Sequence, residues 1–130
     1  GRLFSVGDAT SSNIPNLFAR NERLVCVFET SWGLFCIILV GAMIVGSIRT
    51  VWSMEIKKVY KTSEIQKVDY TSQKTQVKLE KGEEVGHFQL GSTVIVLFEA
   101  GIMELNSNAF INAPVKMGES LGTIVNEEKY

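Results

Sequence analysis

Hydrophobic residues gather in short runs separated by glycine or polar residues along much of this chain. Their β-branched and aromatic composition is typical of strands, and no ten-residue stretch shows a clean helical period. The runs that we expect to form strands are Leu24–Thr30, Gly33–Val40, Ala42–Trp52, Val94–Glu99 and Leu121–Val125. The pattern predicts an all-β fold, a barrel or sandwich of short antiparallel strands joined by glycine turns.

Two stretches lack this pattern. Gly1–Arg23 is rich in turn residues and has little periodicity, so we expect loops there. Ser53–Glu84 is rich in lysine and acidic residues, which favours a long, solvated, partly strand-like excursion. A lysine-rich contact with anionic lipid head groups is the alternative for this segment.

Ser31–Ile48 is long enough to suggest a membrane-spanning helix, because its eighteen residues include no charge. Three glycines (Gly33, Gly41 and Gly46) and an excess of Val, Ile and Phe argue against a helix. We therefore expect two buried strands that are broken at Gly41.

Length and charge narrow the possible functions. With 130 residues the chain is expected to form a single domain, residues 1–130, with one core. Thirteen basic residues against fourteen acidic ones give a net charge of −1. Nucleic-acid binders normally carry a basic face, so this balance argues against a nucleic-acid partner.

Cysteine and histidine are too scarce for a structural zinc site, which needs four nitrogen or sulfur ligands. The chain has only Cys26, Cys36 and His87 for that purpose, so no metal is expected. We expect both thiols to be reduced and buried. If Leu24–Thr30 and Gly33–Val40 form a hairpin, a cross-strand disulfide is a conceivable alternative.

The chemistry-bearing candidate is Gly91-Ser92-Thr93, just before the predicted strand Val94–Glu99. A serine hydroxyl can attack the preceding carbonyl and convert an amide into an ester. Glycine before the serine favours the bent backbone and the open carbonyl that this attack needs. Elimination and hydrolysis would then leave a pyruvoyl group, an electron sink that does the work of pyridoxal phosphate. A simple turn before a strand explains the same triplet without chemistry.

Longer stretches resemble phosphatidylserine decarboxylases of the bacterial and mitochondrial type. The resemblance covers most of the chain, fades over Ser53–Gln76, and is most specific at LGST with its flanking KGEE-x-G-x-F and VIVLF. The matching segments are GRLFSV (Gly1–Val6), Asn16–Trp52, Leu79–Glu99 and VKMGESLG (Val115–Gly122).

The resemblance implies a self-cleaving, membrane-associated lyase. Cleavage would fall between Gly91 and Ser92, leaving residues 1–91 as the β-chain portion and residues 92–130 as the α-chain portion. Ser92 would become the pyruvoyl group that accepts electrons as phosphatidylserine loses carbon dioxide to give phosphatidylethanolamine. The complete protein would be a peripheral enzyme, on the cytoplasmic side of the bacterial cell membrane or at the mitochondrial inner membrane. Its partners would be the phospholipid, its own α and β chains and a second copy of the protein.

Further residues are candidates around that site. Thr93 could donate a hydrogen bond to a reacting oxygen, although a β-branched residue at a strand start needs no such role. Phe4 and Phe18 could line the opening for the head group or lipid. Arg20 and Arg23 could contact a phosphate or carboxylate, or form structural contacts instead.

The family places an aspartate and histidines that assist cleavage and decarboxylation upstream of the region that this sequence matches. We therefore expect this chain to be a fragment of the catalytic domain, uncleaved and inactive by itself. His87 is its only imidazole, and two-residue alternation puts it with Gln89 and Gly91, opposite Phe88 and Ser92. We expect His87 to be exposed or paired at the surface rather than to act as a base.

The competing interpretation is a non-catalytic β-barrel carrier of the lipoyl or biotinyl type. Such a carrier presents a modifiable lysine at an exposed hairpin tip, and Val115–Gly122 gives it some support. Lys116-Met117 has the reverse of the Met-Lys order that such carriers present. A relative that keeps the fold and only binds a ligand is a third interpretation.

Overall fold

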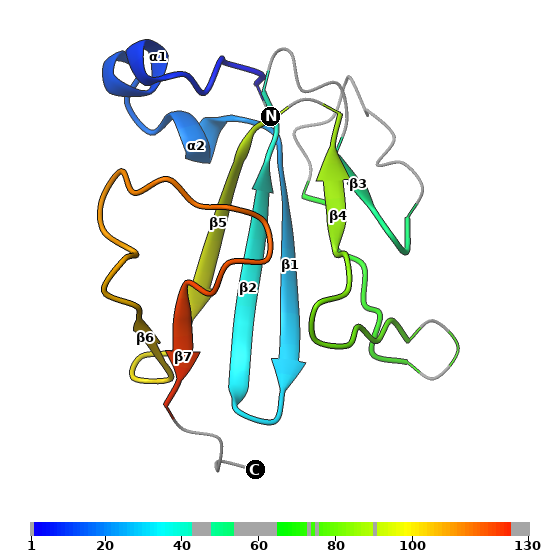
Figure 1. The fold of residues 1–130 in the computed structure, drawn as a ribbon. Coiled ribbons are helices and arrows are strands. Elements are labelled where there is room, and N and C mark those ends of the chain that lie inside the picture. Colours follow the sequence, from blue (N-terminus) through cyan, green and yellow to red (C-terminus); the bar gives the residue numbers. More distant parts are fainter. Residues whose placement is uncertain are drawn as a thin grey trace. The chain divides into compact units, whose positions relative to one another are not determined.

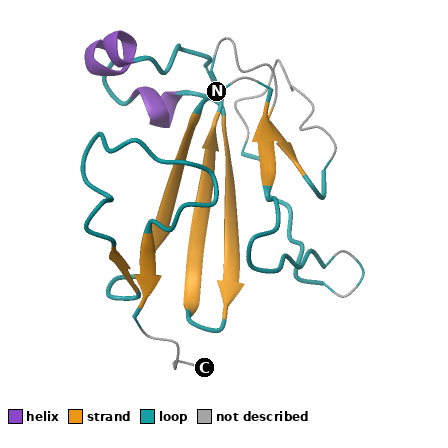
Figure 2. Cartoon of the chain, viewed as in Figure 1, coloured by secondary structure: helices purple, strands orange, loops and turns teal. Residues whose placement is uncertain are grey.

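Strands dominate the computed structural model, which describes residues 2–42, 48–53, 65–72, 74, 76–89 and 91–125. Figure 2 distinguishes the two short helices from the strands by colour. The helices are α1 (Asp8–Asn13) and α2 (Leu17–Arg20). The strands are β1 (Arg23–Thr30), β2 (Gly33–Val40), β3 (Ile48–Thr50), β4 (Gly86–Phe88), β5 (Thr93–Phe98), β6 (Met103–Leu105) and β7 (Gly122–Ile124). The expectation of a mainly β fold is confirmed.

The largest sheet has the strand order β1-β2-β5. β1 and β2 form a hairpin, and β5 pairs with β2 on its other side (Figure 1). Aromatic rings pack around Phe35 of β2. Its ring centroid lies 5.0 Å from that of Phe28, 5.3 Å from that of Trp32 and 5.9 Å from that of Phe98. This cluster fixes the position of the hairpin turn against β5.

Two further sheets contain two antiparallel strands each. β3 pairs with β4, with Arg49 opposite His87 and Thr50 opposite Gly86. β6 pairs with β7, with Glu104 opposite Thr123. The three sheets of the described residues are each open, so the barrel, one of the two predicted alternatives, is not formed among them.

The chain divides into two compact units. The first comprises residues 1–24 and 39–93, and the second comprises residues 25–38 and 94–130. Buried residues of the first unit are mostly apolar, but they include one polar side chain that is wholly inaccessible, that of Asn21. The fully or nearly fully buried apolar residues of this unit are Leu17, Leu39, Val40, Ala42 and Ile48.

Several local predictions need correction. The segment expected to be loops, Gly1–Arg23, contains α1 and α2, which have six and four residues and are too short to show a helical period. The strand expected over Ala42–Trp52 is seen only as β3, and residues 43–47 of that prediction lie outside the described residues. β6 was not predicted because its three residues form too short a run.

The lysine-rich segment was predicted to be partly strand-like and solvated. Its residues 54–64 lie outside the described part of the chain. Val77 and Leu79 alternate in exposure with Lys78, as predicted, but the described residues 76–84 around them form no strand. Alternation without a partner strand therefore gives an extended loop here.

The conceivable disulfide is ruled out by the faces of the hairpin. Phe28 and Phe35 stack on one face, and successive residues of a strand point to opposite faces. Cys26 therefore lies on the face of Phe28 and Cys36 on the other face, and both thiols are free. Cys26 is buried as expected, but Cys36 is only half-buried. Ser31–Ile48 contributes β2 rather than a helix, and no helix among the described residues has the length and apolar character to cross a membrane.

Candidate functional site

Ser92 immediately precedes β5 and lies beside the end of β2. Its side chain is half-buried, and its hydroxyl donates a hydrogen bond to the carbonyl oxygen of Val40. Val40 is the last residue of β2 and is completely buried. Residues 52 positions apart are thus joined within the first unit, and the serine oxygen is held in one orientation.

The peptide unit that receives this hydrogen bond is fixed from its other side. Its N–H belongs to Gly41 and donates to the carbonyl oxygen of Glu22 at 2.7 Å. A β-carbon at Gly41 would lie 3.2 Å from that same oxygen, so glycine permits the close approach. Because the C=O and N–H of a trans peptide point in opposite directions, the contact with Glu22 directs the Val40 carbonyl toward Ser92.

Asn21 holds the next carbonyl of the same segment. Its side-chain Nδ2 donates to the carbonyl oxygens of Gly41 at 3.0 Å and of Phe4 at 2.9 Å. Its Oδ1 accepts the backbone N–H of Phe4 at 2.9 Å. The side chain is 0% exposed, and each of its polar atoms has a partner, as a buried amide requires. Sequence reasoning missed this residue, and its only signal was an asparagine between two charged residues.

Gly91 is exposed, and a β-carbon built on it would meet no atom within 4 Å. Among the described residues, the space where a side chain of residue 91 would lie is therefore open. Thr93 is half-buried as the first residue of β5, so its place in the strand accounts for a β-branched residue.

His87 lies on β4 with its side chain at the surface. Its Nδ1 is 2.8 Å from Oε1 of Glu84, and both side chains are more than half exposed. This confirms the expected surface pairing. Within the described residues, no hydrogen bond links His87 to Ser92.

Two of the basic side chains lie over the ring of Phe4. The guanidinium carbon of Arg20 lies 4.9 Å from the centroid of the Phe4 ring, and that of Arg2 lies 5.8 Å from it. Neither guanidinium has a carboxylate partner among the described residues. Arg20 also donates to the carbonyl oxygen of Pro15 at 3.4 Å. Arg23 donates to the carbonyl oxygens of Ala19 and Asn21, which are structural contacts.

Phe18 stands apart from that group of contacts. It lies on α2 and is 37% exposed, without a stacking partner among the described residues. The structure thus brings Phe4 and Arg20 together and leaves Phe18 at the surface.

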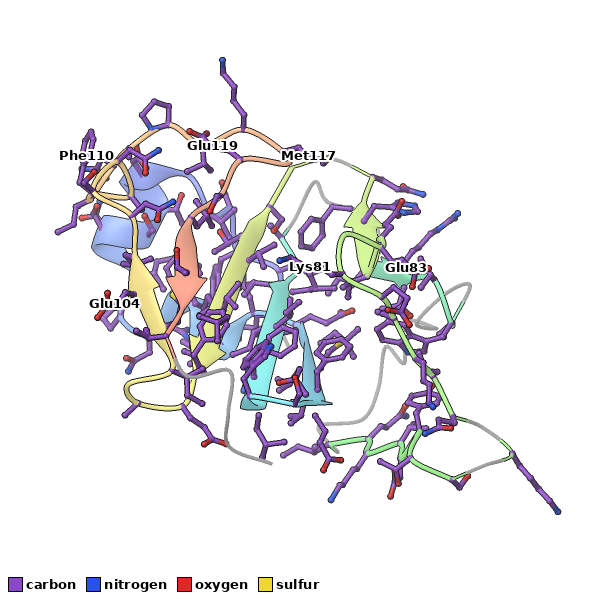
Figure 3. The ribbon with its side chains drawn as sticks, turned by 60° about the horizontal axis from the view of Figure 1, so that its bottom comes forward. Lys81, Glu83, Glu104, Phe110, Met117 and Glu119 are labelled. Carbon is purple, nitrogen blue, oxygen red and sulfur yellow. The ribbon has the colours of Figure 1, made fainter. Side chains whose placement is uncertain are left out.

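The lysine that a carrier would need lies in the loop between β6 and β7. The N–H of Lys116 donates to Oε2 of Glu119 at 3.0 Å, and the N–H of Glu119 donates to the carbonyl of Lys116 at 3.0 Å. These bonds close a turn with Met117 fully exposed at its tip, and Figure 3 shows Met117 and Glu119 on this loop. Lys116 is therefore accessible.

Comparison with known proteins gives a consistent result. A sequence model of the phosphatidylserine decarboxylase family matches residues 1–123. The phosphatidylserine decarboxylase proenzyme of Alcanivorax borkumensis is 47% identical over 130 residues, which is 100% of this chain and 44% of that protein. The proenzyme of Coxiella burnetii is 48% identical over 124 residues, 95% of this chain and 43% of that protein. The proenzyme of Methylococcus capsulatus is 48% identical over 123 residues, 95% of this chain and 42% of that protein.

The chain thus spans less than half the length of the curated relatives that it matches. The family match includes Gly91-Ser92-Thr93 and the Lys116 turn. Because this match extends over almost all of the sequence, the chain belongs to the phosphatidylserine decarboxylase family.

Proposed function

We propose that Gly91–Ser92 is a self-cleavage site and that Ser92 becomes the pyruvoyl group of an enzyme that decarboxylates phosphatidylserine. The observation that carries this proposal is the serine itself. Its hydroxyl is oriented by Val40, and it directly follows an exposed glycine in a chain of this family. Phosphatidylethanolamine and carbon dioxide are the products.

The cleavage chemistry begins with attack of the Ser92 oxygen on the carbonyl carbon of Gly91. The C–N bond breaks as the C–O bond forms, and the hydroxyl proton ends on the freed nitrogen of Ser92. A base then removes the Cα proton of Ser92, a Cα=Cβ double bond forms, and the Cβ–Oγ bond of Ser92 breaks. The carboxylate of Gly91 leaves with the electrons of that bond. One water molecule hydrolyses the remaining enamine through its imine form, releases ammonia and leaves the pyruvoyl group on residue 92.

The residues present fit this group. The exposed position of Gly91 leaves room for the attack and for later access of a substrate amine. The carbonyl of the buried Val40 holds the serine hydroxyl by a hydrogen bond. When formed, a pyruvoyl group supplies a carbonyl that accepts electrons from a carboxylate-bearing carbon. Thr93 would donate a hydrogen bond to a reacting oxygen in that arrangement.

Substrate binding in this proposal uses Arg20 beside Phe4. A guanidinium with no carboxylate partner among the described residues is suited to the phosphate or carboxylate of a phosphatidylserine head group. Phe4 and the exposed Phe18 would contact apolar parts of the lipid. The complete enzyme would work at a membrane surface, with its α and β chains associated and as a homo-oligomer.

The general base is not expected among these residues, because His87 is engaged at the surface with Glu84. General-base assistance is typically worth about 10²–10⁴ in rate. This chain by itself is therefore expected to remain uncleaved and inactive.

The test is mass spectrometry of the complete gene product and of its Ser92→Ala variant. We expect a break between Gly91 and Ser92, a pyruvoyl group on the second fragment, and release of carbon dioxide from phosphatidylserine vesicles. Ser92→Ala should remain one chain without activity. A variant that still separates into two chains would place the cleavage site elsewhere, and an intact wild-type chain with a modified Lys116 would favour the carrier.

A further inference from the structure

We infer that Asn21 is a positioning residue for self-cleavage, acting on Ser92 through the segment Val40–Gly41. This inference rests on the proposed cleavage at Gly91–Ser92. Asn21 lies in the first unit and contacts neither Gly91 nor Ser92 through any hydrogen bond found among the described residues. Its influence therefore has to pass through the backbone that it binds.

The first link is the anchoring of Asn21 itself. The residues on either side of Asn21 form backbone hydrogen bonds with Arg2. The N–H of Arg2 donates to the carbonyl oxygen of Arg20 at 2.9 Å. The N–H of Glu22 in turn donates to the carbonyl of Arg2 at 2.8 Å. The side chain of Asn21 then binds both polar groups of Phe4. These bonds leave the buried amide no freedom to rotate without losing a partner.

The second link runs from this anchored amide to the end of β2. The side chain of Asn21 holds the carbonyl of Gly41, and the carbonyl of Glu22 holds the N–H of Gly41. Two consecutive peptide units are thereby fixed in direction. The first of them carries the Val40 carbonyl that accepts the hydroxyl of Ser92.

The chemical consequence concerns the geometry of attack. The Ser92 oxygen must lie near the carbonyl carbon of Gly91, and misplacement by about 1 Å can cost on the order of 10² in rate. If Asn21 is truncated, the carbonyls of Gly41 and Phe4 lose their buried donor, and the end of β2 is free to shift. The hydroxyl of Ser92 would follow its acceptor away from the productive orientation.

The experiment measures the rate of cleavage of the complete gene product with and without hydroxylamine. Hydroxylamine converts an ester at Gly91 to a hydroxamate, so cleavage in its presence reports the acyl shift alone. Cleavage without it reports the acyl shift and the elimination together. We expect Asn21→Ala to slow both reactions by about tenfold or more. The shape of the pH profile should stay unchanged, because an amide does not titrate. Ser92→Ala gives the background rate.

Gly41→Ala is the second variant. Its methyl group would crowd the carbonyl oxygen of Glu22, which accepts the N–H of the Val40–Gly41 peptide unit. It should slow the acyl shift as well, and it decides the question if Asn21→Ala does not fold.

Asn106→Ala is the matched control. The side chain of Asn106 also bridges two loop segments, with bonds of 3.0 and 3.2 Å to Ser120, but it lies in the second unit, and its loss should leave the cleavage rate unchanged.

Failures of the two proposals are distinguishable. If the wild-type protein is not cut between Gly91 and Ser92, the proposed function fails. If the wild type is cut there and folded Asn21→Ala or Gly41→Ala is cut at the same rate, only the role of Asn21 is overturned. An altered pH profile in Asn21→Ala would also contradict it, because a change of base and not of position would then limit the reaction.

Discussion

The α-carbon of Gly86 faces the backbone of Arg49 so closely that a β-carbon added there would overlap the Arg49 carbonyl oxygen. Gly86 begins β4 and pairs with Thr50 of β3. The approach of the two strands therefore depends on the missing side chain. A β-carbon added at Gly91, five residues further along the chain, would meet no described atom within 4 Å.

We expect Gly86→Ala to destabilise the protein by about 1–3 kcal/mol, the usual cost of forcing a methyl group into a packed site. Gly91→Ala should change the free energy of unfolding by no more than about 0.5 kcal/mol, yet slow self-cleavage, because its methyl group crowds the carbonyl that Ser92 attacks. Urea unfolding measures the stability of both variants, and mass spectrometry measures the self-cleavage of Gly91→Ala. Equal stability of the two variants would contradict the close contact at Gly86.

The aromatic cluster around Phe35 should be the main support of the hairpin. Phe35→Ala removes ring contacts with Phe28, Trp32 and Phe98, and we expect a loss of about 2–4 kcal/mol, somewhat below the range for a fully buried phenylalanine. The fluorescence of Trp32 should shift to longer wavelength. Phe110→Ala is the control, because Phe110 is 66% exposed in the β6–β7 loop and should cost about 0.5 kcal/mol or less.

Burial, with a smaller contribution from Cys36, raises the pKa of the Cys26 thiol to about 11. The folded state thus holds this proton more tightly than the unfolded chain does. The stabilising contribution is complete below the ordinary pKa of the thiol and is lost as the pH rises from about 9 to about 11.

Cys26→Ala should remove that part of the pH dependence, as measured by denaturant unfolding at a series of pH values. Burial also raises the pKa of Cys36, but less of this side chain is removed from water. Cys36→Ala should therefore have the smaller effect. Identical pH curves for the wild type and Cys26→Ala would show that the thiol of Cys26 is not desolvated in the folded protein.

Arg20→Ala should raise the KM for phosphatidylserine vesicles several-fold and leave self-cleavage intact, because the proposed role of this guanidinium is to bind an anionic group beside Phe4. Lys116→Ala, which removes an exposed positive charge in the second unit, controls for general attraction to the membrane. An equal rise of KM in both variants would exclude a specific site at Arg20.

The sequence by itself determined the main strands and the family, and it supplied the hypothesis of self-cleavage at Gly91–Ser92. Strand-forming runs such as Arg23–Thr30 and Thr93–Phe98 are recognised from consecutive β-branched and aromatic residues. The bounds of β1, β2 and β5 were therefore predicted within one or two residues. The motif at Gly91-Ser92 and the family resemblance are likewise properties of short segments. The two-residue alternation around His87 also predicted its exposed position, although the strand β4 that carries it was not predicted.

Only the tertiary structure decided which groups meet. The acceptor of the Ser92 hydroxyl is a backbone carbonyl 52 residues away, and no side-chain type marks such an atom in a sequence. Asn21 gained its role because three backbone groups converge on it, whereas its residue type is usually found at the surface. The two cysteines, close in sequence, were separated by the alternation of a hairpin whose register is fixed by the stacking of Phe28 on Phe35. Long-range contacts of this kind depend on how strands pair, and the local pattern does not specify that pairing.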